Sequence, residues 1–413
     1  MAFVLTLWTL ASYICIALTS WLLAWTVYYD FTRTHIPPGI KEHAKLRVGN
    51  LLLNFAFGLG LFLEKLGICS QTKIMRIIFD GIPPKKDSRL LIKDLFFEHV
   101  PVRVYWPSSP SPAGNRKGLL YIHGGVGQVG SIRAYERVCR FLARNSNSVV
   151  VNIGFRLSPE YPPPIQSQDC LTAAVHFLKY AKDYGVDPNC IAVGGDSSGA
   201  TGAAALCQQL VGRVDLPRIR AQFLLYPFLQ ALDFNLPSYQ QNHSVPILFK
   251  KRAISLGFKY FKMKNIDIAR LMQNAHIPED LRVKYKKWVS ADHIPDEFKV
   301  RGYVPVEPAP FSEELYELAK LALETWFSPL LAEDEIIRQL PETFLLTCEY
   351  DVLRDDGLLY KKRLEDNGVP VTWHHLKDGF HGIAFPIDFG LPEFQSTRSG
   401  MKTVIHFLCG LSK

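Results

Sequence analysis

The chain opens with a continuous apolar run. Residues 3–29 carry no charged side chain, and a run of this length can cross a bilayer as one helix. Trp21, Trp25 and Tyr28 gather toward its end, as aromatic side chains do at a membrane interface. A cleaved signal peptide is the alternative, but the run is too long, no Lys or Arg precedes it, and bulky aromatic residues stand where small residues should precede a cleavage site. The pattern predicts a retained membrane anchor over residues 1–32.

A second apolar run lies in residues 33–88. It covers residues 51–63, is too short to span a bilayer, and is interrupted by Asn54, Gly58 and Gly60. Such a run fits either a buried helix or an apolar lip resting at the membrane interface. We expect residues 33–88 to form a membrane-proximal cap segment that does some of each.

From residue 89 the pattern changes to short apolar runs separated by turn residues. Alternation over 90–106 predicts antiparallel strands, which are followed by the polar loop PSSPSPAGNRKG. Beyond residue 118, apolar runs alternate with helix-length segments, which is typical of a mostly parallel sheet with helices on both faces. Residues 230–330 break this rhythm and are rich in Lys, Pro, Trp and Tyr. They are interpreted as a cap inserted into an α/β catalytic domain over 89–413.

Charge and cysteine content exclude several classes of protein. The 47 basic and 39 acidic residues give a net charge of +8, but the basic residues are scattered. No run follows a phosphate backbone, so we expect no nucleic-acid partner. None of the eight cysteines lies in a CxxC or a Cys/His cluster with zinc spacing. Because Cys15 belongs to the anchor, seven remain, and the pattern supports neither a disulfide framework nor a metal site.

The clearest chemical signal is the pentapeptide GDSSG at residues 195–199. It follows the apolar run 191–193 and precedes a helix of small residues. This is the context of a nucleophile elbow, in which glycines flank a serine on a tight strand-to-helix turn. A glycine-rich turn that merely contains a serine is the weaker interpretation. We expect Ser197 to be a nucleophile, in a turn formed with Gly195, Asp196, Ser198 and Gly199.

A serine nucleophile needs a general base, and the base needs an orienting acid. On this kind of sheet the chain order should be Ser, then Asp or Glu, then His. Asp351 ends the apolar run TFLLTCEY, and His381 follows the next strand-like segment. They are the predicted acid and base. The rival acids are Asp355 and Asp356, which we place in the first turn of the following helix, and Asp378.

A third motif, His123-Gly124-Gly125, directly follows the apolar run LLYI. Glycines without side chains let backbone N–H groups approach a substrate carbonyl, which suits an oxyanion hole. His123 is interpreted as a residue that fixes the loop. His374 and His375 lie within a strand pattern, and one or both are expected to be structural. Together the three motifs predict a serine acyl hydrolase.

These motifs also resemble a known family. The segments HGG, FRLSPEYPPP, GDSSG, YDVLRDDG and DGFHG are similar to the hormone-sensitive-lipase branch of the α/β-hydrolases. The anchor and the segments LLYPFLQALDFNLPSY and SPLLAEDEIIRQLPETFLLTCEYDVLRDDG resemble the arylacetamide deacetylase-like family. The resemblance implies an α/β-hydrolase fold, no cofactor, and Ser197, Asp351 and His381 as nucleophile, acid and base. It implies an oxyanion hole formed by the N–H groups of Gly124, Gly125 and Ser198.

The chain departs from the family pattern at two main places. Val126 replaces the third glycine of HGGG, and because valine resists positive φ we expect it to disturb this loop and slow turnover. Gln128 replaces the cysteine that in the family pairs with the counterpart of Cys348, so Cys348 should be free. Ser198 stands where the family usually has alanine, and Ala200 replaces a glycine; both changes are small.

Three functions are compatible with this pattern. The leading hypothesis is a membrane-anchored serine hydrolase acting on lipophilic esters or amides. The second is a catalytically weakened relative that binds lipid or a partner, supported by Val126 and Gln128. The third is a soluble secreted enzyme, which would need cleavage near residue 30.

Two arguments about membrane orientation disagree. The basic residues after the anchor would keep the following domain cytosolic by the positive-inside rule. The resemblance implies a single-pass type II protein of the endoplasmic reticulum with a lumenal catalytic domain, and long domains translocate largely regardless of charge. Asn242 begins the sequon Asn-His-Ser within the presumed cap, where we expect a glycosylated surface position. We therefore expect a lumenal domain. The opposing basic residues are Arg33, Lys41, Lys45 and Arg47.

Overall fold

A twisted sheet forms the centre of the computed structural model, which describes residues 2–109, 116–263 and 266–411. Within these residues the sheet has eight strands in the order β1-β2-β4-β3-β5-β6-β7-β8. The β1–β2 and β2–β4 pairs are antiparallel, and the other pairs are parallel. The strands are β1 (Leu90–Phe97), β2 (Val100–Pro107), β3 (Arg116–Ile122), β4 (Val149–Ile153), β5 (Val186–Asp196), β6 (Ala221–Leu225), β7 (Glu342–Tyr350) and β8 (Val371–Phe380).

This sheet confirms the predicted α/β class. Strands β4 and β6 are buried at every position, which explains their continuous apolar sequences. The alternation over 90–106 forms the antiparallel hairpin β1–β2, as predicted. Most of the predicted polar loop after β2 lies outside the described residues, which resume at 116.

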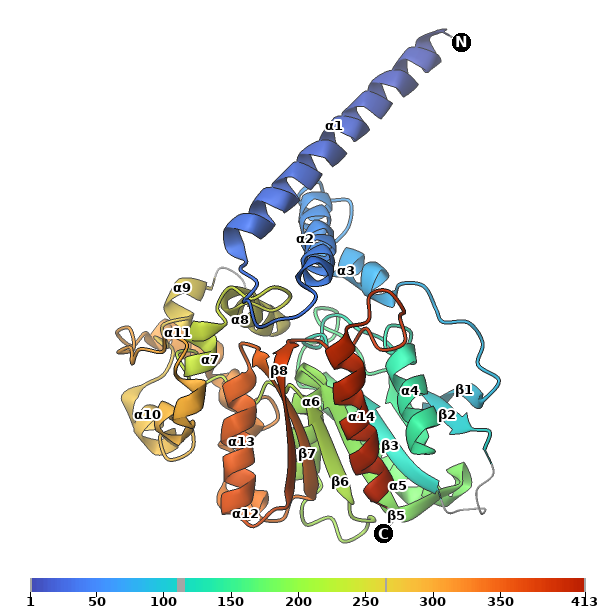
Figure 1. Cartoon of the computed structure of the whole chain (residues 1–413), viewed down its shortest axis with the longest axis vertical. Helices are drawn as coiled ribbons and strands as arrows, with labels where there is room; N and C mark the ends of the chain where they lie inside the picture. Colours follow the sequence, from blue (N-terminus) through green and yellow to red (C-terminus); the bar gives the residue numbers. More distant parts are fainter. Residues whose placement is uncertain (1, 110–115, 264–265, 412–413) are drawn as a thin grey trace.

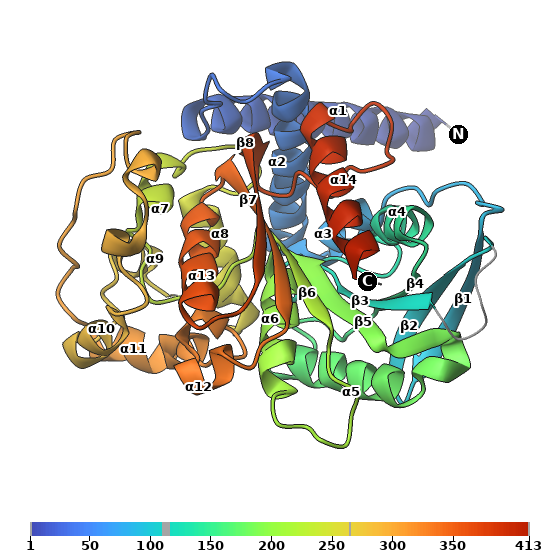
Figure 2. The same ribbon diagram turned by 60° about the horizontal axis from the view of Figure 1, so that its bottom comes forward.

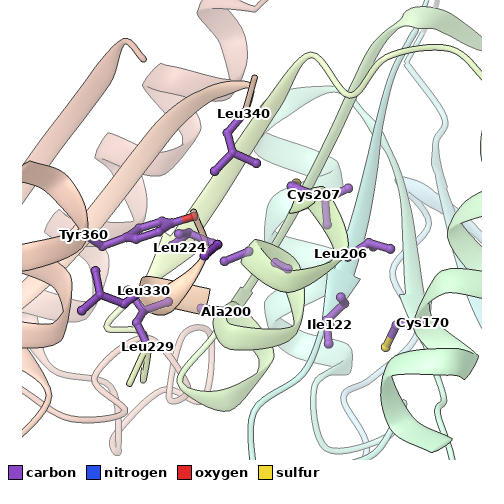
Figure 3. Close-up of a cluster of buried hydrophobic side chains, with 14 of the residues drawn as sticks. Ile122, Cys170, Ala200, Leu206, Cys207, Leu224, Leu229, Leu330, Leu340 and Tyr360 are labelled. Atoms are coloured by element: carbon purple, nitrogen blue, oxygen red, sulfur yellow. The ribbon is translucent and has the colours of Figure 1, made fainter. Parts of the chain in front are cut away.

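Helices cover both faces of the sheet (Figure 2). The helices α4 (Glu136–Ser146) and α14 (Gln395–Gly410) pack in one buried cluster. The helices α5 (Ile165–Lys179), α6 (Ser198–Gln209) and α13 (Arg354–Asp366) pack in the other, which includes Ala200 and Leu206 of α6 and Leu224 of β6 (Figure 3). Helix α6, which starts directly after Ser197, is therefore held in the core along most of its length.

The remaining short helices lie mostly in the segment predicted to be a cap. Its α8 (Lys250–Tyr260) contributes side chains to the cavities around Ser197, described below. The other short helices are η1 (Ala181–Tyr184), α7 (Pro237–Gln241), α9 (Ile268–Leu271), α10 (Glu279–Tyr285), η2 (Ala291–His293), η3 (Asp296–Phe298), α11 (Glu313–Ala319), η4 (Lys320–Leu323), η5 (Pro329–Leu331) and α12 (Asp334–Ile337).

The N-terminal helix α1 (Ala2–Arg33) projects away from the rest of the molecule (Figure 1). It exposes large apolar side chains such as Trp8 and Trp21. Two stretches within the described residues are long and apolar enough to cross a membrane, Trp8–Arg33 and His43–Lys65. The second is helix α2, of 23 residues, so the helix is longer than the apolar run 51–63 that by itself is too short. Helix α2 is followed by α3 (Gln71–Asp80).

The glycine at position 58 lets α1 and α2 approach closely. A Cβ on Gly58 would lie 2.7 Å from the Trp25 ring of α1. Below this contact, the fully buried Asp30 carboxylate accepts hydrogen bonds from Arg47 and Asn54 of α2, at 2.5 and 2.9 Å, and from Asn50. A buried carboxylate is stable only when it is paired and hydrogen-bonded. The base of α1 is therefore built into the domain.

The same polar cluster reaches the segment 230–330, which is interpreted above as an inserted cap. The Asn50 side-chain oxygen accepts a hydrogen bond from the Ile247 amide at 2.8 Å, and Arg252 donates to the Asn54 side-chain oxygen. Cleavage near residue 30, which a soluble secreted enzyme would need, would cut the chain at this buried cluster. The packing therefore argues against that hypothesis.

Candidate active site

The strand-to-helix turn after β5 is built on close backbone contact. Ser197 lies between β5 and α6 with φ of 53°. A Cβ on Gly195 or on Gly199 would lie 2.2 or 2.1 Å from the Ile122 carbonyl oxygen of β3, so neither position can carry a side chain. The two glycines allow the turn to press against β3, and the turn presents Ser197 at the carboxyl edge of the sheet, as the GDSSG motif predicts.

The three predicted side chains of the triad meet at this edge. The Ser197 hydroxyl lies 2.9 Å from Nε2 of His381, and Nδ1 of His381 lies 2.9 Å from Oδ2 of Asp351. Asp351 directly follows β7 and His381 directly follows β8, so both loops leave the same edge as the turn after β5. An Nδ1–H donated to the carboxylate leaves Nε2 as an acceptor for the serine proton. The arrangement is able to activate a serine.

Geometry also decides among the four candidate acids, all of which lie in the described part of the chain. Only Asp351 contacts His381. Asp355 and Asp356 lie in the first turn of α13, as predicted, and are fully buried. Burial raises the pKa of Asp356 to about 7. The three rivals have other partners: Asp355 accepts from the Ser238 amide, Asp356 from the Leu229 amide, and Asp378 pairs with Lys41.

The structure contradicts the prediction that Asn242 is a glycosylated surface residue. Asn242 is fully buried, and its side-chain nitrogen donates to the carbonyl oxygens of Glu349 and Asp351, at 3.1 and 2.8 Å. A glycan cannot be attached to a nitrogen enclosed in this way, so the prediction is wrong for the folded protein. The residue instead supports the backbone that carries Asp351. A sequon pattern contains no signal that would have revealed this role.

The loop after β3 differs from the predicted oxyanion hole at Gly124. The Gly124 N–H donates to Oδ1 of Asp196 at 3.0 Å, so it is already used and the prediction for this amide is wrong. The amides of Gly125 and Ser198 have no hydrogen-bond acceptor among the described residues. Two of the three predicted donors are therefore free to bind a substrate oxygen.

Val126 occupies a strained position in the loop. It has φ of 56°, in the left-handed region that is unfavourable for a β-branched side chain. Its N–H donates to the Ser198 hydroxyl at 2.7 Å. Because this hydrogen bond holds Val126 in place, Val126 gives less support for a catalytically weakened relative.

Buried polar residues brace this loop from behind. The Asp196 carboxylate accepts hydrogen bonds from the hydroxyls of Tyr121 and Tyr135, both at 2.9 Å. Burial raises the pKa of Asp196, and these hydrogen bonds oppose the rise. His123 stacks on Phe155 with ring centres 4.2 Å apart, and burial lowers its pKa to about 4, so it is neutral at physiological pH. These contacts fit the predicted role of His123 in fixing the loop.

Other sequence-based expectations concern residues near the site. His375 contacts Thr347 and Glu349 at 2.9 and 3.1 Å within the β7–β8 pair, a structural position as predicted. Cys348 is buried and unpaired, and Gln128 donates instead to the Leu256 carbonyl at 2.8 Å. None of the described residues forms a cluster of three or more His, Cys, Asp or Glu that could hold a metal ion.

Two cavities of very different size meet at Ser197. The larger, about 1260 Å³, lies between α2, α3, α8 and the loop after β8, and is also lined by His381. The smaller, about 120 Å³, lies on the Ser198 side and is not lined by His381. Apolar side chains line the larger cavity: Leu53, Phe57, Met75, Phe79, Phe385 and Phe394. The smaller is closed by Ile122, Val126, Phe155, Phe228, Trp326 and Phe327.

Comparison with known proteins defines the class. A family profile described as "alpha/beta hydrolase fold" matches residues 119–280 and 304–385. A thermostable esterase from Pseudomonas putida shares the fold, with a TM-score of 0.63 and 20% identity over 92% of this chain and 99% of that one. The structure of DphMB1 gives a TM-score of 0.61 at 25% identity, covering 83% of this chain and 91% of that one. The chain is an α/β-hydrolase of the carboxylic-ester hydrolase class.

Curated relatives narrow the family further. The chain is 44% identical to human arylacetamide deacetylase-like 4, over 94% of this chain and 95% of the relative. It is 43% identical to mouse arylacetamide deacetylase-like 3, over 94% of each chain, and 38% identical to bovine arylacetamide deacetylase, over 85% and 89%. The chain belongs to the arylacetamide deacetylase-like family, as its motifs indicated.

The burial of Asn242 predicts that it supports catalysis and carries no glycan. Asn242→Asp replaces the donor by a carboxylate oxygen facing two carbonyl oxygens, and unsatisfied buried polar groups cost about 1–3 kcal/mol each. We expect a loss of about tenfold or more in kcat on a short-chain ester. Ser244→Ala is the matched control, because it destroys the sequon and leaves Asn242 in place. It should change neither kcat nor electrophoretic mobility; an endoglycosidase-sensitive band that disappears in Ser244→Ala would contradict the prediction.

Proposed function

We propose that this chain is a membrane-anchored serine hydrolase that removes short acyl groups from lipophilic alcohols or amines. The observation that carries the proposal is the hydrogen-bonded chain Ser197–His381–Asp351 placed between a large and a small cavity. Membership of the arylacetamide deacetylase-like family supports the same conclusion, since that name specifies removal of an acetyl group from an aryl amide.

The proposed reaction uses only side chains and amides of this chain. Ser197 attacks the substrate carbonyl carbon while Nε2 of His381 takes the serine proton, and Asp351 stabilises the resulting imidazolium. The carbonyl oxygen becomes an oxyanion. It is stabilised by the Gly125 amide of the loop after β3 and by the Ser198 amide at the N-terminus of α6. His381 then gives its proton to the leaving alcohol or amine, and the acyl group remains on Ser197. Water, deprotonated by His381, attacks the acyl-enzyme and releases the carboxylic acid.

The positions of the two cavities support one placement of the two halves of the substrate. The leaving group must face His381, because it receives the proton from Nε2, and His381 lines the large cavity. The acyl chain then points into the small cavity beside Ser198. The small cavity, of about 120 Å³ against about 1260 Å³ for the large one, suits the shorter half of the substrate. The site therefore favours a short acyl group on a large apolar alcohol or amine.

The position of the large cavity suits substrates dissolved in a bilayer. Its lining includes Val48, Leu52 and Leu391, whose side chains are 56%, 66% and 91% exposed. Exposed apolar side chains around a cavity mouth are typical of contact with lipid. Helices α1, α2 and α3 lie on the same side of the sheet (Figure 1), so an anchor in the bilayer would hold the mouth close to the membrane. Lipophilic substrates could then enter without crossing water.

The first prediction from this proposal concerns the triad. Ser197→Ala should abolish hydrolysis and labelling by a fluorophosphonate probe, with the melting temperature unchanged within a few degrees. Asp351→Asn should lower kcat by about 10³–10⁴, because His381 loses its orientation and tautomer. Asp378→Asn is the matched control and should retain wild-type kcat. Labelling that persists in Ser197→Ala would show that another residue is the nucleophile.

The second prediction concerns acyl length. The wild-type protein should hydrolyse acetate esters at least about tenfold faster than octanoate esters of the same alcohol, because each misfit methylene costs about 1–3 kcal/mol. Phe327→Ala enlarges the small cavity and should narrow this ratio. Phe385→Ala, in the large cavity, is the control and should leave the acyl ratio unchanged while altering KM for bulky alcohols. Equal rates for both esters in the wild-type protein would contradict the assignment of the cavities.

The third prediction concerns orientation in the membrane. We propose a lumenal catalytic domain in the endoplasmic reticulum, supported by the family resemblance of the anchor and opposed by the basic residues that follow it. In intact microsomes containing the full-length protein, added protease should leave the domain intact, and detergent should expose it. Digestion of the domain without detergent would place it in the cytosol.

A further inference from the structure

The oxyanion loop is held against the nucleophile turn by two hydrogen bonds. The Gly124 N–H donates to Asp196 at 3.0 Å, and the Val126 N–H donates to the Ser198 hydroxyl at 2.7 Å. Asp196 and Ser198 are the immediate neighbours of Ser197, and the amides they hold are the immediate neighbours of the Gly125 amide. The Gly125 amide, which has no acceptor among the described residues, therefore lies in the chain between two amides that are bound to the nucleophile turn.

The two hydrogen bonds differ in how firmly the surrounding structure holds the groups that form them. The Asp196 carboxylate is buried and fixed by Tyr121 and Tyr135. The second hydrogen bond restrains Val126, whose φ of 56° is unfavourable for a β-branched residue. A valine without a tether would favour negative φ, and the peptide between Gly125 and Val126 would rotate. The Ser198 hydroxyl opposes that rotation, because it accepts the N–H of this peptide.

Neither nucleophilic attack nor helix formation requires the Ser198 hydroxyl, so it is able to accept the Val126 N–H. It is not the nucleophile, since Nε2 of His381 contacts Ser197. Ser198 begins α6, where an alanine would serve the helix equally well, so the helix itself does not require the hydroxyl. The contact thus joins two of the four residues noted above as departures from the family pattern, Val126 and Ser198.

We propose that Ser198 is a positioning residue whose hydroxyl holds Val126 in the left-handed conformation and so keeps the Gly125 amide directed at the substrate oxygen. The proposal rests on the proposed hydrolase function. The serine hydroxyl compensates for the unfavourable positive φ of valine. With valine at 126 the hydroxyl is required for full turnover, and with glycine at 126 it is dispensable.

A double-mutant cycle on the full-length protein tests this coupling. Ser198→Ala should lower kcat on a short-chain ester about tenfold or more, with KM within about twofold, since loss of a whole oxyanion donor costs about 10²–10³. Val126→Gly provides the second background, and its own kcat is the reference for the double variant. Adding Ser198→Ala to Val126→Gly should then cost less than about threefold, because glycine adopts positive φ without a tether. Ser198→Thr keeps a hydroxyl and should retain most of the turnover.

A second readout separates positioning from a general loss of structure. A trifluoromethyl ketone forms a tetrahedral adduct with the serine and places an oxyanion in the hole, so its affinity should fall in Ser198→Ala in parallel with kcat, at an unchanged melting temperature. An equal loss of kcat from Ser198→Ala in the wild-type and Val126→Gly backgrounds, or no loss in the wild-type background, would overturn the proposal. Absence of ester hydrolysis in the wild-type protein would instead overturn the hydrolase function itself.

Discussion

The contact between the turn at Ser197 and strand β3 is the constraint on which the site depends. Gly195 and Gly199 both face the Ile122 carbonyl at distances that no Cβ could occupy. This contact brings the N-terminus of α6 beside the loop that follows β3, where Gly199 also packs against the His123 backbone. A side chain at either glycine would push the turn away and separate the nucleophile from the oxyanion loop.

The parallel sheet then collects the other groups. Parallel strands end at the same edge, so the loops after β5, β7 and β8 meet although Ser197 and His381 are 184 positions apart in the chain. Buried polar residues set the conformation of these loops. Asn242 holds the carbonyl of Asp351, and Asp196 holds the amide of Gly124. Buried polar groups need partners, so these contacts give each loop one preferred conformation.

The N-terminal region connects this site to helix α1. The Asp30 carboxylate at the base of α1 accepts a hydrogen bond from α2. Helix α2 in turn lines the large cavity and contacts Ile247 and Arg252 of the segment 230–330. Helix α1 is thus joined through α2 to the wall of the cavity. This arrangement gives the proposed access of lipophilic substrates from the bilayer a structural basis.

The sequence by itself determined the strands of the sheet and the order of the catalytic residues along the chain. Apolar periodicity specified the strands, GDSSG placed the serine on its turn, and Asp351 and His381 stood at the ends of the right strands, because these signals are local. Tertiary structure alone decided how those residues use their hydrogen bonds. The Gly124 amide is taken by Asp196, Asn242 is buried behind Asp351, and Val126 is tied to Ser198. The unequal cavities likewise arise from segments far apart in the chain. Each of these features depends on which distant atoms packing brings within about 3 Å, and no local pattern encodes that distance.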